Sequence, residues 1–343
     1  SLINVGGDET YELGTGRSRE EAERRGVGEL YLDFIRRIHS LLSKRNRRIM
    51  IYADIILKHG HLVEKVPGDI ILIEWGYESD HPFEEECRRI AEAGLEFYVC
   101  PGTSSWNSIG GRWENARKNI LSAAQAGLNY AAAGFLLADW GDNGHLQQLP
   151  VSVPAYFLGA AAAWNTDRAA YFNPVTALAL FFFKTENISA AEALMLMQNL
   201  YRNERALIPN ASIQALLITP QLQPDAEEFL AHYRDYDFSR EIKVLEMVEK
   251  LLSGSDREID LLLKDELEFT MKLLRHACRQ GRLRFAAPHL TLEEIDAQDR
   301  HELAEELDSL ADEYLNLWKR RSRPGGLDRS VSRMDALKER YRS

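Results

Sequence analysis

Five short apolar runs alternate with helical patterns over the first 165 residues, and this alternation constrains the fold more than any other feature. The first run begins at Ile3, and the others cover residues 48–54, 69–75, 95–100 and 132–140. Helical patterns lie between or after them, at 18–44, 82–93, 113–126 and 153–164. Runs 48–54 and 69–75 are almost continuously apolar, which is typical of strands that a parallel sheet buries on both faces. The sequence therefore predicts an α/β fold with a parallel sheet and right-handed crossovers.

Beyond Asn165 the strand signal disappears. The remaining chain reads as consecutive helices at 174–184, 188–203, 224–235, 239–253, 256–281 and 292–322, with a last helix that follows a Pro-Gly-Gly turn and ends at Arg342. An apolar stripe with spacings of three and four residues predicts that these helices pack against one another; it consists of Ile259, Leu263, Leu267, Met271 and Leu274. We therefore expect two domains, 1–165 and 166–343.

Composition excludes some classes of partner. The net charge is -11, so there is no basic excess with which to bind a nucleic-acid backbone. No apolar run reaches the length of a membrane-spanning helix, so we expect no membrane partner. The three cysteines are widely spaced and form no disulfide framework or metal-binding pattern, which favours the reducing cytoplasm.

Polar and aromatic residues follow every predicted strand. In parallel β/α folds the functional residues gather at the carboxyl ends of the strands. These ends carry, in chain order, Asp8 and Glu9, Tyr52 and Asp54, Glu74 and Trp75, Tyr98 and Cys100, then Asp139, Trp140 and Asp142. Aromatic rings stack on the C–H faces of sugars and carboxylates accept hydrogen bonds from hydroxyls, so this pattern favours a sugar site.

The first strand end has a specific motif. Neighbouring side chains in a strand point to opposite faces, so Asp8 and Glu9 can face one ligand only where the backbone turns. Gly6 and Gly7 permit such a turn.

The stretch Val5-Gly6-Gly7-Asp8-Glu9 resembles the Gly-Gly-Asp-Glu signature of family 20 glycoside hydrolases, the β-N-acetylhexosaminidases. Trp75, Tyr98 and Trp140-Gly141-Asp142 fall where that family has its pocket residues. The resemblance implies that residues 1–165 are the C-terminal portion, strands 4 to 8, of a TIM (β/α)8 barrel, with the first three strands in a missing N-terminal portion. The all-α part, which contains Trp318, resembles the helical extension of one bacterial branch of the family.

The same resemblance implies a retaining exo-enzyme that removes terminal N-acetylglucosamine or N-acetylgalactosamine from oligosaccharides, with the substrate's 2-acetamido group as nucleophile. Glu9 would be the general acid/base, Asp8 would orient the acetamido group, and Tyr98 would bind its carbonyl. Residues expected to contact the sugar are Tyr52, Asp54, Trp75, Trp106, Trp140 and Asp142. No cofactor or metal is expected, and a homodimer is one assembly that the sequence leaves open.

Two positions depart from the family pattern: Tyr52 stands where Trp is frequent, and Cys100 where many members carry Asp. The preference between the two sugars therefore stays open.

Three alternatives remain. A barrel glycosidase with a carboxylate nucleophile would need an acid at the end of the fourth predicted strand, but Glu96 is near that strand's start. A metal hydrolase could use Asp54, His59, His61 and His145, although this is not the spacing of a known zinc motif. The third alternative is an inactive, sugar-binding fragment.

Overall fold

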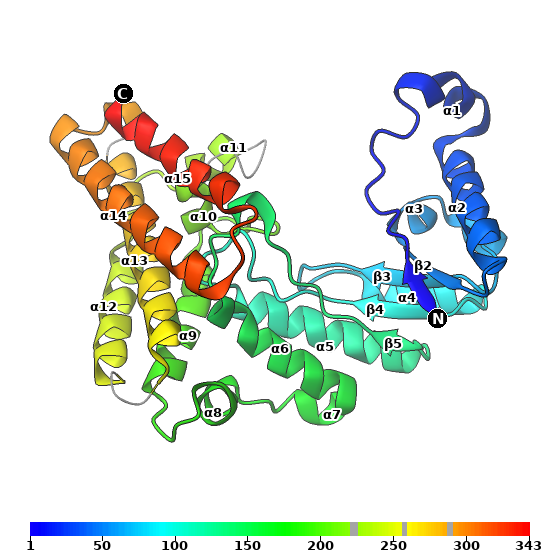
Figure 1. Ribbon diagram of the computed structural model, residues 1–343, viewed down its shortest axis with the longest axis horizontal. Coiled ribbons are helices and arrows are strands. Elements are labelled where there is room, and N and C mark those ends of the chain that lie inside the picture. The colour runs from blue at the N-terminus through cyan, green and yellow to red at the C-terminus, as the bar shows by residue number, and fades with distance from the viewer. Residues whose placement is uncertain (220–225, 256–258, 287–290) are drawn as a thin grey trace. The chain divides into compact units, whose positions relative to one another are not determined.

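The computed structural model describes residues 1–219, 226–255, 259–286 and 291–343 (Figure 1). The chain divides into two compact units. The first, called the sheet unit, comprises Ser1–Gly102, Lys118–Ala138 and Ala161–Ala170. The second, called the helical unit, comprises Thr103–Arg117, Asp139–Ala160 and Tyr171–Ser343.

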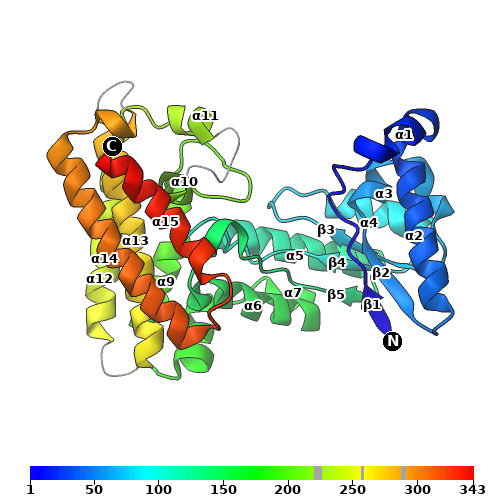
Figure 2. The same cartoon turned by 45° about the horizontal axis from the view of Figure 1, so that its top comes forward.

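The sheet unit contains five parallel strands that pair in the order in which they occur in the chain. The strands are β1 (Leu2–Asn4), β2 (Arg48–Tyr52), β3 (Ile71–Trp75), β4 (Phe97–Cys100) and β5 (Gly134–Phe135). The prediction of an α/β fold with a parallel sheet is therefore confirmed. Figure 2 shows the strands side by side, with β1 and β5 at the two edges.

Strand β5 is shorter than the predicted 132–140. Only Gly134 and Phe135 pair regularly with β4. The following residues still run beside β4, since the amide groups of Leu136 and Ala138 donate to the carbonyls of Val99 and Pro101 at 2.9 Å each. The apolar pattern thus identified the segment, but regular pairing stops early within it.

The two faces of the sheet differ in how they are covered. Ile49, Ile51 and Leu72 belong to a large buried cluster with apolar residues of α2 (Val27–Ser43) and α4 (Phe83–Glu92). The opposite face carries a smaller cluster in which only Met50, Ile71, Ile73 and Cys100 are fully buried. Because side chains alternate along a strand, almost continuously apolar strands supply both faces.

The helices follow the predicted order with some differences at their ends. Those not yet given are α1 (Arg19–Arg25), α3 (Asp54–Lys58), α5 (Trp113–Asn129), α6 (Leu149–Trp164), α7 (Thr166–Ala169), α8 (Pro174–Ala177), α9 (Ser189–Gln198), α10 (Ile213–Ile218), α11 (Ala226–Ala231), α12 (Ser239–Gly254), α13 (Leu261–Phe285), α14 (Ala297–Arg321) and α15 (Leu327–Arg342). Shorter helical turns are η1 (Gly16–Ser18), η2 (Gly60–Lys65), η3 (Asp142–Gly144), η4 (Leu178–Phe183), η5 (Leu200–Asn203) and η7 (Leu292–Glu294).

One predicted helix was wrong. The pattern at 18–44 predicted a single helix, but the chain forms α1 and α2, which are separated at Gly26. Gly26 has a φ of 87°, which lies outside the right-handed helical region. The apolar residues at helical spacing, Leu30, Phe34, Ile38 and Leu41, all lie in α2, whereas α1 has Ala22 as its single apolar residue, so the pattern gave no support for a helix that continues across Gly26. Helix α10 was not predicted, although Ser212 caps it by accepting from the amide of Ala215.

Past Phe135, the described residues form helices and no strand. Helix α13 packs against α12 and α14, and α14 packs against α15. Leu267, Met271 and Leu274 of the predicted stripe are buried. The starts of the predicted helices 224–235 and 256–281, at 224–225 and 256–258, lie outside the described residues.

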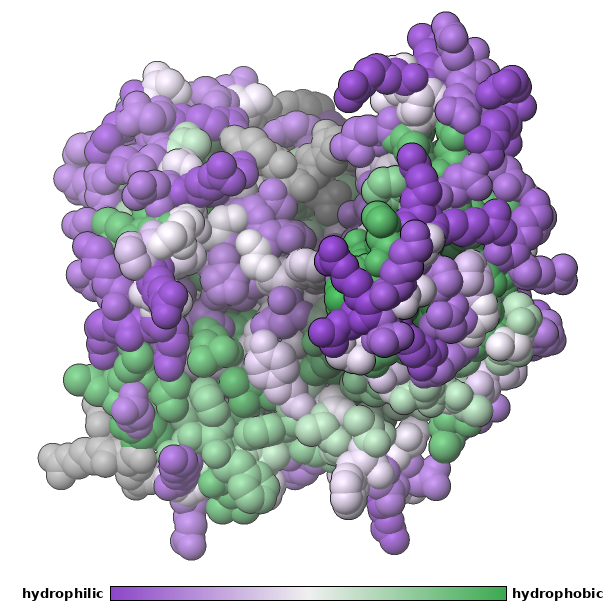
Figure 3. Space-filling model, turned by 45° about the vertical axis from the view of Figure 1, so that its right-hand side comes forward, coloured by the Kyte–Doolittle hydropathy of each residue, from purple (hydrophilic) through white to green (hydrophobic). Residues whose placement is uncertain are grey.

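Part of the helical unit exposes apolar side chains between Tyr171 and α9. Tyr171, Leu180, Phe181 and Ile188 are all exposed. Figure 3 shows apolar surface gathered toward the bottom of the face that it draws. Within the described part of the chain, none of the helices combines the length and the apolar character needed to cross a bilayer.

Candidate functional site

The turn after β1 depends on glycine. Gly6 and Gly7 have φ angles of 70° and 91°, in a region that L-residues rarely occupy. A Cβ atom at Gly7 would lie 2.7 Å from the hydroxyl oxygen of Tyr31 on α2. The amide of Tyr52 donates to the carbonyl of Gly6 at 3.1 Å, so the turn still pairs with the end of β2.

Three carboxylates gather around this turn. The backbone amide of Glu9, whose φ is 51°, donates to Oδ2 of Asp54 at 3.0 Å. The hydroxyl of Tyr11 donates to Oε1 of Glu9 at 3.1 Å. The pKa of the Tyr31 phenol is raised, mainly by burial and to a smaller extent by the negative charges of Asp54 and Asp8. Asp8 is half-buried and Glu9 is exposed, so both carboxylates are accessible at the carboxyl end of β1.

Three of the predicted aromatic residues share the less covered face of the sheet. Tyr52, Trp75 and Tyr98 all pack on the smaller apolar cluster and stay partly exposed. The rings of Tyr52 and Trp75 meet edge to face with centroids 6.4 Å apart. Tyr98 packs over Gly134 so closely that a Cβ there would lie 2.2 Å from its ring. The face therefore offers apolar ring surface, as a sugar needs.

Cys100 contributes apolar packing at the end of β4. It pairs in register with Trp75 and is buried. Burial, and to a smaller extent the charge of Glu74, raises the pKa of its thiol to about 12. Glu96 precedes β4 and forms an ion pair with Arg48 at 2.7 Å, near the amino end of the strands. Among the described residues, Glu96 is thus the carboxylate that β4 carries next to it, and it lies at the amino end of the strand.

In the helical unit, Asp139 accepts three hydrogen bonds from hydroxyl groups. Oδ1 accepts from Thr103 at 2.5 Å and Ser105 at 2.6 Å, and Oδ2 accepts from Tyr156 at 2.5 Å. Thr103 and Ser105 precede α5, and Tyr156 lies in α6. Asp139 therefore joins the segment that precedes α5 to α6.

The other three predicted site residues also belong to the helical unit. Trp106 is 2% exposed and is part of the packed interior. Trp140 is 40% exposed, and its carbonyl accepts from Nε2 of Gln147 at 2.8 Å. Asp142 is exposed at the start of η3, and desolvation raises its pKa.

A cavity of about 280 Å³ in the helical unit was not predicted. Its lining includes Asp139, His145, Gln147, Tyr314 and Trp318. The rings of His145 and Trp318 stand perpendicular with centroids 6.2 Å apart. The hydroxyl of Tyr314 donates to the carbonyl of His145 at 3.0 Å. Asp139 and Trp318 were both noted in the sequence, but the sequence does not indicate that they line the same cavity.

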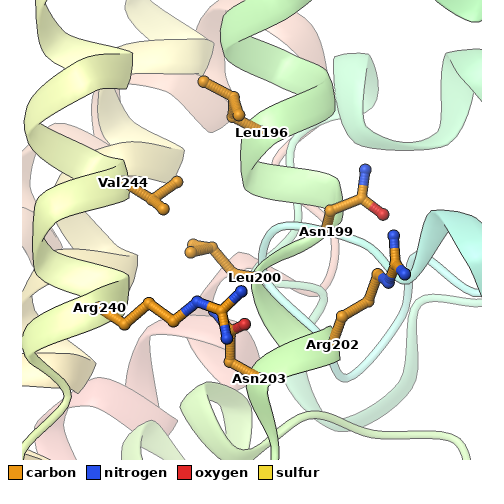
Figure 4. A pocket seen from close by; sticks show the side chains of 7 residues that line it. All are labelled: Leu196, Asn199, Leu200, Arg202, Asn203, Arg240 and Val244. Carbon is orange, nitrogen blue, oxygen red and sulfur yellow. The ribbon is translucent and has the colours of Figure 1, made fainter.

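A second cavity of the helical unit, about 310 Å³, lies between α9, η5 and α12. Figure 4 shows Leu200 and Val244 facing this space, with Arg240 of α12 and Asn203 of η5 also in its lining. None of the predicted site residues lines it.

The described residues contain one group of side chains with the spacing of metal ligands, namely Glu74, His81 and Glu86. None of the residues of the metal-hydrolase alternative belongs to it. His59 and His61 have ring centroids 6.4 Å apart, and His61 lies 3.9 Å from Glu29.

Gly7→Ala is expected to destabilise the sheet unit more than Gly16→Ala. Both glycines have positive φ, so each alanine incurs a backbone cost of about 1–2 kcal/mol, but a Cβ at Gly16 meets nothing within 4 Å. The contact with Tyr31 should add about 1–3 kcal/mol at Gly7. Chemical denaturation measures both losses. Adding Tyr31→Phe should recover part of the loss at Gly7, and equal losses at the two glycines would contradict this account.

The sequence matches no model of a known protein family, and no curated protein matches it significantly.

Proposed function

We propose that the protein is a retaining exo-β-N-acetylhexosaminidase that resembles family 20 glycoside hydrolases. Its substrates would be oligosaccharides that end in N-acetylglucosamine or N-acetylgalactosamine. One observation carries the proposal: a Gly-Gly-Asp-Glu turn ends β1 of a parallel sheet whose next three strands present Tyr52, Trp75 and Tyr98 on one face. Carboxylates and aromatic rings at the carboxyl ends of parallel strands are the usual composition of a glycosidase site in a β/α fold.

We further propose that the five strands are strands 4 to 8 of a (β/α)8 barrel. In such a barrel consecutive strands are neighbours, helices cover the outer face and side chains fill the interior. The order β1 to β5 and the helix-covered cluster are compatible with this arrangement. Leu2 and Ile3 of the edge strand β1 are 45% and 37% exposed, and a neighbouring strand would cover them.

In the proposed reaction, Glu9 gives its proton to the glycosidic oxygen while the bond from that oxygen to C1 breaks. The carbonyl oxygen of the substrate's acetamido group attacks C1 and forms a cyclic oxazolinium ion. Asp8 accepts the acetamido N–H, and the Tyr98 hydroxyl donates to the acetamido oxygen. Glu9 then removes a proton from water, which attacks C1 and reopens the ring, so two inversions give retention.

The contacts around Glu9 support its role as the acid/base. The hydrogen bond from its amide to Asp54 fixes the backbone of the turn, so we propose that Asp54 positions Glu9 in addition to any contact with sugar. The Tyr11 hydroxyl binds the Glu9 carboxylate, and Tyr11 itself is exposed, so substrate can replace this bond. Tyr52 and Trp75 supply ring surface for the sugar. The sugar-contacting roles of Trp106, Trp140 and Asp142 stay predictions.

A thiazoline analogue of the oxazolinium ion is expected to inhibit release of nitrophenol from a chromogenic N-acetylglucosaminide competitively. A 2-fluoro glycoside, which traps carboxylate nucleophiles, should leave the protein unlabelled in a mass spectrum. A covalent adduct on a carboxylate would instead support the alternative mechanism. Binding of the thiazoline without any turnover by the folded protein would support the sugar-binding alternative and contradict the proposed enzyme.

A further inference from the structure

Three ionisable side chains of the sheet unit meet on the side of β3 opposite to Trp75. Glu74 comes from β3, His81 from the following loop and Glu86 from α4. Nε2 of His81 lies 2.7 Å from Oε1 of Glu74 and 3.6 Å from Oε2 of Glu86. One potential ligand atom from each residue lies within 4.8 Å of the other two.

This cluster is buried and incompletely satisfied. The Glu74 side chain is 0% exposed, and its Oε2 atom has no hydrogen-bond partner. Burial raises the pKa of Glu74 to about 7, and burial followed by the hydrogen bond and the charge of Glu74 raises that of Glu86 to about 7; burial lowers the pKa of His81. A buried carboxylate oxygen without a partner is costly, and native proteins usually provide a donor or a cation.

The loop that carries His81 is held in place from several sides. A Cβ atom at Gly76 would lie 2.2 Å from the imidazole, so the ring rests directly on the backbone there. The Asn119 amide donates to the carbonyls of Gly76 and Glu78 at 2.9 Å each. The His81 ring also packs edge-on against Phe83, with centroids 4.4 Å apart. These contacts preorganise the imidazole toward both carboxylates.

We propose that Glu74, His81 and Glu86 bind one divalent transition-metal cation, with Zn²⁺ as the best match. One imidazole nitrogen and two carboxylate oxygens suit Zn²⁺, whereas Mg²⁺ and Ca²⁺ prefer sites made of oxygen alone. Ligand bonds of about 2.0–2.2 Å require only small side-chain rotations from the present spacing. Three protein ligands leave a position for water. The cation would tie the carboxyl end of β3 to α4, on the face of the sheet opposite to Trp75.

The test is a calorimetric titration of the metal-stripped, complete protein with Zn²⁺, repeated with Mg²⁺. One Zn²⁺ per chain is expected, and Mg²⁺ should not compete. Co²⁺ is a second probe, since visible absorption of low-coordinate Co²⁺ should appear with the same stoichiometry. Absence of Zn²⁺ binding by the unaltered protein would overturn the proposal, whatever its catalytic activity.

Variants locate the site. Glu74→Gln and His81→Gln should abolish stoichiometric binding, and Gly76→Ala, which displaces the imidazole without removing a ligand, should weaken it by about 10–100-fold. His61→Gln is the matched control, because His61 is exposed and lies outside the cluster. Circular dichroism checks that each variant folds. If Glu74→Gln does not fold, Glu86→Gln replaces it as the carboxylate variant. Unchanged affinity in the cluster variants, or loss of binding in His61→Gln, would contradict the assignment.

Discussion

Glu9→Gln is expected to lower the turnover of an N-acetylglucosaminide with a poor leaving group by about 10²–10⁴-fold, the usual contribution of a positioned acid/base. Glutamine has the same shape and keeps the hydrogen bond from Tyr11, but it can neither donate the catalytic proton nor activate water. The amide-to-Asp54 bond that fixes the turn involves only the backbone and should persist. Initial rates at saturating substrate measure the effect.

Two comparisons test whether the loss of turnover in Glu9→Gln comes from the missing proton transfer to the leaving group. With a dinitrophenyl leaving group, which needs no proton, the loss in the first step should be much smaller. Glu12→Gln, an exposed glutamate three residues further along, should keep the unaltered turnover. A Glu9→Gln protein with full turnover on the poor leaving group would show that another residue is the acid.

Arg321→Met is expected to reduce the free energy of unfolding of the helical unit by about 3–5 kcal/mol. Arg321 of α14 donates two hydrogen bonds to Glu266 of α13, at 2.7 and 2.6 Å. The Glu266 side chain is 0% exposed, so removing the arginine leaves a buried carboxylate without its counter-charge. Denaturant unfolding monitored by circular dichroism provides the measurement.

The adjacent arginine gives a matched control. Arg320 pairs with Asp265 at 2.6 Å between the same two helices, but both side chains are partly exposed. Arg320→Met should therefore cost at most about 1 kcal/mol. The double change Glu266→Leu with Arg321→Met should recover much of the loss, because no charge is left buried. Equal losses for the two single arginine variants would contradict the burial argument.

The sheet could be predicted because its strands have a distinct composition. Residues 48–52 and 71–75 are almost continuously apolar and are β2 and β3. The break at Gly26 was missed because the helix indicated by the apolar spacing of α2 was extended back over α1, which has Ala22 as its single apolar residue. The early end of β5 could not be predicted, because regular pairing with β4 depends on the tertiary structure and the apolar pattern carries no information about it.

The part of the candidate site at the carboxyl ends of the strands could be predicted, because functional residues of parallel β/α folds gather there. Tyr52, Trp75 and Tyr98 are each two residues or fewer from the end of a strand and share one face. The group of Glu74, His81 and Glu86 was not found, because a loop and a helix bring the last two residues back to β3. The three hydroxyl groups that donate to Asp139 were not predicted either, because the fold brings a loop and a helix to this carboxylate.

The most direct test of the account is the rate of hydrolysis of aryl glucosaminides whose acetamido group carries zero, one, two or three fluorine atoms. Fluorine withdraws electrons from the acyl oxygen that we propose as nucleophile, so the turnover number should fall steeply with each added fluorine. A turnover number that does not depend on fluorination would contradict participation of the acetamido group at Asp8 and Glu9.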